Sequence, residues 1–62
     1  MAESAEEARG RLARYRKGAA HAEALAAAAN SPELHDAYLG VARTWSDLAE
    51  QLERELSAKE GR

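Results

Sequence analysis

The chain has 62 residues, with nine basic and eleven acidic side chains, two histidines, no cysteine and a formal net charge of −2. This length limits it to one domain, in a size range where a hydrophobic core alone is marginal and a disulfide, a metal or self-association usually adds stability. The absence of cysteine excludes disulfides and thiolate metal sites. The nearly balanced charge gives no overall attraction to nucleic acid or anionic lipid.

A first helix is predicted over about residues 5–29. Ser4 and Glu7 have the spacing of a capping box, in which each side chain accepts a hydrogen bond from the other residue's backbone amide. Small and apolar residues then recur at alternating steps of three and four, the period of one helix face. They are Ala5, Ala8, Leu12, Tyr15, Ala19, Ala22, Ala26 and Ala29. Gly10 and Gly18 interrupt this helix, each at a cost of up to about 1 kcal/mol.

A two-residue turn is predicted to follow the first helix. Asn30 tolerates the left-handed conformation that often ends a helix. Ser31 can cap the next helix, and Pro32 suits its first position, where the missing N–H would have had no partner. Because the linker is so short, the two helices are expected to be antiparallel neighbours.

A second, more apolar helix is predicted over about residues 32–57. Bulky residues recur along it at steps of four and three, as on the buried stripe of an amphipathic helix. They are Leu34, Tyr38, Val41, Trp45, Leu48 and Leu52. The sequence therefore predicts an all-α fold, an antiparallel two-helix hairpin that forms a single domain over 1–62. Residues 1–3 and 58–62 are expected to be frayed ends.

The two helices differ in bulk, and this difference predicts self-association. The second helix carries eight bulky apolar residues and the first carries three. A helix faced with alanine is too narrow to cover so wide a stripe, and a lone hairpin falls near or below the balance between apolar burial and chain entropy. We therefore expect two hairpins to join through the six-residue stripe in a dimeric four-helix bundle. A different protein partner or a marginally stable monomer is the alternative.

A basic segment lies within the first helix. Residues 9–17 place five cations beside a tyrosine, a composition that could bind nucleic acid or an acidic protein. The cations spread over more than half the helix circumference, so a solvated surface that pairs with the acidic end of the second helix is favoured. If this segment does meet a partner, the contacts are expected at Arg11, Arg14 and Lys17.

Two leucines lie beside the main stripe. Leu25 accompanies a small-residue face of the first helix, and Leu39 lies beside Ala42 on the second. If a dimer buries the main stripe, these leucines could form an exposed patch for an unidentified protein partner. The simpler interpretation, which we favour, makes them flanks of a four-helix core.

No residue pattern indicates catalysis or a bound cofactor. His21 and His35 lack the spacing of convergent metal ligands. The serines occupy caps or exposed helix positions, without an oxyanion site or a pocket. The longest uncharged stretch, 24–32, is far too short to span a bilayer and does not follow a basic N-terminus. We expect no enzyme, no cofactor, no metal, no small-molecule substrate, no membrane span and a cytoplasmic location.

A resemblance covers a little over half of the chain. Residues 15–49 read YRKGAAHAEALAAAANSPELHDAYLGVARTWSDLA. This run resembles a group of short uncharacterised bacterial helical-hairpin proteins, in which Tyr-Arg and spaced alanines precede an acidic-Pro turn and a Leu, Ala, Trp, Leu-Ala pattern. The matching positions are Tyr15, Arg16, Ala19, Leu25, Ala26, Pro32, Glu33, Leu39, Ala42, Trp45, Leu48 and Ala49.

The resemblance implies an oligomeric hairpin and supplies no catalytic residue. Many members of the group carry a cysteine where this chain has Ala22, so a redox or metal role would not carry over. Residues and resemblance together favour a non-enzymatic structural or interaction module that acts as a homodimer. The alternative is a small nucleic-acid-associated regulator that uses the basic segment 9–17.

Overall fold

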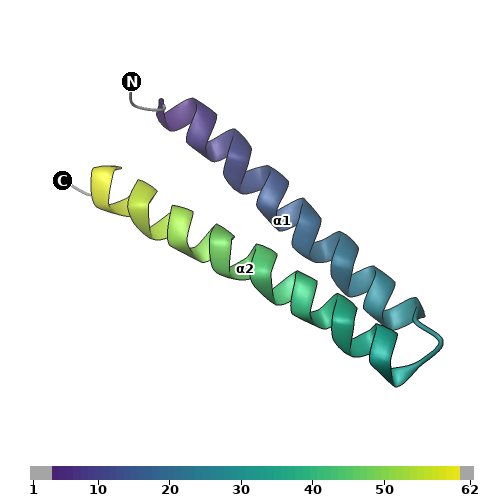
Figure 1. Ribbon diagram of the computed structural model, residues 1–62. Helices are drawn as coiled ribbons and strands as arrows, with labels where there is room; N and C mark the ends of the chain where they lie inside the picture. The colour runs from purple at the N-terminus through teal and green to yellow at the C-terminus, as the bar shows by residue number, and fades with distance from the viewer. Residues whose placement is uncertain (1–3, 61–62) are drawn as a thin grey trace.

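The computed structural model, which describes residues 4–60, consists of two long antiparallel helices joined by a short turn (Figure 1). Helix α1 spans Ala5–Ala28, and helix α2 spans Pro32–Glu60. The predicted all-α hairpin is confirmed. Because the helices are antiparallel, the start of α1 and the end of α2 lie together at the end of the hairpin opposite the turn (Figure 1), which we call the open end.

The predicted capping box at the start of α1 is confirmed. The backbone N–H of Glu7 donates to Ser4 Oγ at 3.1 Å, and the backbone N–H of Ser4 donates to Glu7 Oε1 at 3.1 Å. These two bonds satisfy amides that have no partner within the helix. The local sequence thus sets where α1 begins.

The turn matches the prediction at Ser31 and Pro32 and differs from it at Asn30. The backbone N–H of Leu34 donates to Ser31 Oγ at 3.2 Å, so Ser31 caps α2, whose first residue is Pro32. The left-handed conformation expected at Asn30 is wrong, because no residue that the structure describes has a positive φ. Instead Ala29 turns the chain out of α1 with extended backbone angles, φ −66° and ψ 143°.

Helix α2 is longer than predicted. It continues through Glu60, whereas the sequence pattern indicated an end near Ser57 and a frayed tail from residue 58. No glycine or proline interrupts residues 58–60, and Lys59 places a positive charge in the last turn, where the helix dipole favours it. Residues 1–3 and 61–62, the remainder of the predicted frayed ends, lie outside the described residues.

The core is uneven along the hairpin. Near the open end, Leu52 and Leu56 pack against Ala8, and the partly buried Leu12 and Tyr15 adjoin this cluster. Toward the turn, the most deeply buried residues are all small. They are Ala19, Ala22, Ala26 and Ala42, while Ala49 is buried between this stretch and Leu52. Small side chains let the helices approach closely, but they remove little apolar area from water. The half of the hairpin next to the turn is therefore held by a thin core.

The hairpin is elongated. Its principal extents are 46 × 18 × 15 Å, and its radius of gyration is 14.2 Å. A compact domain of this length has a radius of gyration of about 10.6 Å. A two-helix rod leaves both of its broad sides open to solvent, and these two sides differ in chemistry.

Candidate functional site

One side of the hairpin carries bulky apolar side chains that α1 does not cover. Leu34, Val41 and Leu48 are 49, 48 and 38% exposed. They are spaced seven residues apart, so they lie along one line of α2. We call the side of the hairpin that carries these three residues the apolar face.

Aromatic side chains lie between this line of residues and α1. The ring centroids of Tyr15 and Trp45 are 5.8 Å apart with an interplanar angle of 41°, a tilted aromatic contact between the two helices. The guanidinium carbon of Arg11 lies 6.0 Å from the centre of the Tyr15 ring, within reach of a cation–π interaction. Tyr15 and Trp45 are half-buried, so each contributes to the hairpin contact and still reaches the surface.

Gly18 is the residue that admits Trp45 to this contact. A Cβ atom at Gly18 would lie 2.8 Å from two atoms of the indole ring, closer than the Cβ atoms of real proteins come to neighbouring heavy atoms. The sequence analysis treated Gly18 as an interruption of the helix and as part of the small-residue face beside Leu25, and its contact with Trp45 was missed. The available signal was its position: folding about the turn brings Tyr15 level with Trp45, the bulkiest side chain of α2, and Gly18 follows Tyr15 by about one helical turn.

The six residues predicted to form one self-association stripe divide into three groups. Leu52 is buried inside the hairpin, and Tyr38 and Trp45 are half-buried. Only Leu34, Val41 and Leu48 remain largely exposed to solvent. The stripe is therefore shared between the hairpin's own contact and a free surface.

The residues predicted for contact with a partner also differ in exposure and do not all lie on one side of the hairpin. Arg14 and Lys17 are exposed, while Arg11 is half-buried beside Tyr15. Leu25 is 37% exposed. Leu39 is half-buried on the other side of the hairpin, in a shallow depression that it shares with Glu23, Ala42, Arg43, Ser46, Asp47 and Glu50. Leu25 and Leu39 thus do not form a single patch.

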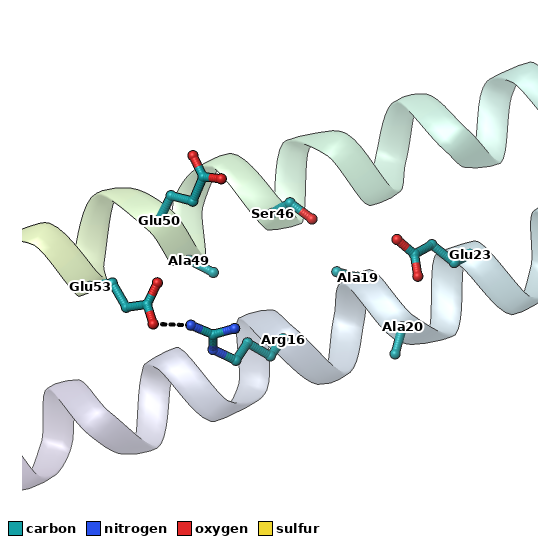
Figure 2. A pocket seen from close by; sticks show the side chains of 8 residues that line it. All are labelled: Arg16, Ala19, Ala20, Glu23, Ser46, Ala49, Glu50 and Glu53. Carbon is teal, nitrogen blue, oxygen red and sulfur yellow. Dashed lines mark hydrogen bonds and ion pairs between the residues drawn. The ribbon is translucent and has the colours of Figure 1, made fainter.

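The opposite side of the hairpin is charged. A second shallow depression there is lined by Arg16, Ala19, Ala20, Glu23, Ser46, Ala49, Glu50 and Glu53 (Figure 2). Arg16 extends from α1 toward α2 and forms an ion pair with Glu53, which confirms that the basic segment pairs with the acidic end of α2. Both side chains are about half exposed, so water screens the pair. We call this side the charged face.

The two histidines have different surroundings. His35 Nδ1 donates to the backbone carbonyl oxygen of Ala26 at 2.8 Å, which ties the start of α2 to the end of α1. His21 is exposed. Among residues 4–60 there is no group of three or more histidine, aspartate or glutamate side chains placed to hold a metal ion.

Neither helix, over the residues described, is long and apolar enough to cross a membrane. Comparison with protein families, curated proteins and solved structures gives no match. The resemblance to the bacterial hairpin proteins therefore stays a prediction. The chemistry of the two faces is the remaining guide to function.

Proposed function

We propose that the chain is a non-enzymatic structural or interaction module that acts as a homodimer, a four-helix bundle in which the apolar face of each hairpin covers that of the other. The exposure of Leu34, Val41 and Leu48 along one line of α2 carries this proposal. Burying a side chain of this kind completely contributes roughly 1.5–3 kcal/mol. A thin alanine core leaves the hairpin in need of that contribution.

The total surface area supports the same conclusion. The chain exposes 4809 Å², whereas a folded monomer of its mass exposes about 3,900 Å². The excess is close to the roughly 800 Å² that each partner buries in a stable interface of standard size. One further surface of ordinary dimensions would bring the exposed area of each hairpin to the usual value.

A role with nucleic acid through residues 9–17 is the alternative. Arg14 and Lys17 are exposed and could meet phosphates, but Arg16 is already engaged by Glu53. Binding by so few cations would be weak, and its salt dependence would be shallow because few counterions would be released. The apolar face therefore gives the stronger argument.

Sedimentation equilibrium of the purified chain at micromolar concentration tests the proposal. The wild-type chain is expected to sediment as a dimer. Val41→Glu places a carboxylate in the middle of the apolar face and should weaken the dimer by about 2 kcal/mol or more, roughly 30-fold in dissociation constant. The matched control is Ala13→Glu, which adds the same charge at an exposed position of α1 and should leave the dimer intact.

The mass at which the wild-type chain sediments tests the homodimer even if Val41→Glu loses its helical structure. A wild-type monomer that melts cooperatively at these concentrations would contradict the proposal. So would a Val41→Glu variant that dimerises as tightly as Ala13→Glu. In that case the apolar face would have to be assigned to a different protein.

A further inference from the structure

We propose that the two hairpins dock with their turns at the same end, so that α2 of each copy lies on α1 of the other. This inference rests on the proposed homodimer and adds which surfaces meet. It follows from the order of residues along the apolar face, from their sizes and from the charges near the open end.

Two lines of residues seven apart border the apolar face. On α1 the line consists of Arg11, Gly18 and Leu25, and on α2 it consists of Leu34, Val41, Leu48 and Glu55. Arg11, Leu48 and Glu55 line one shallow depression, so the two lines lie on the same side of the hairpin. The α1 line is mostly small or polar, and the α2 line is mostly bulky and apolar.

A two-fold axis parallel to the helices keeps every residue at the same height along the bundle in both copies. It places α1 of one copy opposite α2 of the other. The contact of Trp45 with Gly18 fixes which levels correspond. In the resulting dimer, Leu25 of one copy lies level with the gap between Leu34 and Val41 of the other. Gly18 likewise lies level with the gap between Val41 and Leu48. Leu25 thus enters a space between two projecting side chains of the partner, as in coiled-coil packing. Val41 and Leu48 of the partner instead meet the half-buried Trp45 indole that lies against Gly18.

Charge favours the same orientation. Arg11 of one copy falls level with the gap between Leu48 and Glu55 of the other. Arg11 already lines the same depression as Glu55 of its own chain, so the dimer would gather both Arg11 and both Glu55 side chains near the open end of the bundle. The charges therefore distinguish this arrangement from one in which each α2 pairs in parallel with α2 of the other copy. In that arrangement Glu55 would face Glu55.

Docking with the turns at opposite ends is less favourable. It stacks α2 on α2 and α1 on α1, so that bulky residues meet bulky residues and small residues meet small ones. If the two copies centre on Val41, residues 51–60 of each α2 extend beyond the turn of the other copy. Less apolar area is then buried, although association costs the same translational and rotational freedom.

Disulfide trapping with single-cysteine variants tests the orientation, because the chain has no cysteine of its own. The variants are Leu25→Cys and Val41→Cys, at positions that are 37 and 48% exposed in the hairpin. A disulfide forms only when the two Cα atoms come within about 7 Å. With turns at the same end, positions 34 and 41 of one chain border position 25 of the other, so the cysteines at 25 and 41 are neighbours across the interface. The two copies of position 41 then lie diagonally across the bundle, about 14 Å apart.

The two variants, one carrying a mass tag, are mixed and oxidised, and each is also oxidised alone. The expected result is a mixed disulfide between the two variants. Neither variant should form a disulfide when it is oxidised alone. A disulfide between two Val41→Cys chains would overturn the proposal in favour of opposite ends. A wild-type chain that sediments as a dimer without giving the mixed disulfide would overturn it as well. A wild-type monomer would instead overturn the homodimer on which it rests.

Discussion

The indole ring of Trp45 lies directly against the backbone of Gly18, where a Cβ atom would come within 2.8 Å of two ring atoms. Glycine usually weakens a helix, because its backbone loses the most freedom when the helix forms. Here the missing side chain is what allows the largest residue of α2 to reach α1. The site thus exchanges local helix stability for a contact between helices.

Gly18→Ala is expected to destabilise the hairpin although alanine is the better helix former. Displacing the indole should cost about 1–3 kcal/mol, which offsets the gain of up to about 1 kcal/mol in helix propensity. Gly40→Ala is the matched control, because nothing lies within 4 Å of a Cβ at that position. Thermal unfolding followed by circular dichroism should give a lower melting temperature for Gly18→Ala and a higher one for Gly40→Ala. Two variants that shift in the same direction would refute the packing role of Gly18.

Ser31→Ala is expected to weaken the start of α2. The substitution removes the oxygen that accepts the backbone N–H of Leu34, a loss of about 1 kcal/mol for a typical helix cap. Ser57→Ala provides the control, since Ser57 is exposed within α2 and caps no helix. Urea unfolding should show a lower midpoint for Ser31→Ala and little change for Ser57→Ala.

Glu53→Gln is expected to change stability very little. Its ion pair with Arg16 is about half exposed, and such pairs contribute between 0 and about 1 kcal/mol. The difference from wild type should shrink further in molar salt, where the screening length is only about 3 Å. A loss well above 1 kcal/mol in urea unfolding would show that the charged face contributes more to the hairpin than its exposure indicates.

Reversing the exposed charges of the basic segment is expected to leave the homodimer intact. Arg14→Glu combined with Lys17→Glu alters two exposed positions of α1 and none of the bulky residues of the apolar face. Sedimentation should therefore still give a dimer. If the wild-type chain shifts a nucleic acid probe at low salt and the double variant does not, the regulatory alternative gains its support.

Much of the fold follows from local sequence, because the relevant interactions are local. Ser4 with Glu7, and Ser31 with Pro32, set where the two helices begin, and each helix start depends on atoms within one turn. The ends are harder to predict, since they depend on small differences in fraying. The expectation for the last residues of α2 was wrong for that reason. The left-handed conformation expected at Asn30 was wrong because the chain leaves α1 through extended backbone angles at Ala29.

The candidate site was harder to predict than the fold. Periodicity shows that Leu48 and Leu52 share a stripe, but the rotation of α2 against α1 decides which of them is buried. That rotation depends on tertiary contacts such as the one between Gly18 and Trp45, which no local pattern contains. The sequence therefore indicated an excess of apolar surface without showing which residues carry it.

The uneven core has a consequence for amide hydrogen exchange. In a separate hairpin, the amides around Leu52 and Leu56 should exchange more slowly than those of residues 34–48, because the buried bulky side chains of the core lie near the open end. This order is the reverse of the usual one, in which the ends of a chain open first. Covering the apolar face would slow exchange most in the half next to the turn, so the region beside the turn is the one that gains most rigidity when a partner binds.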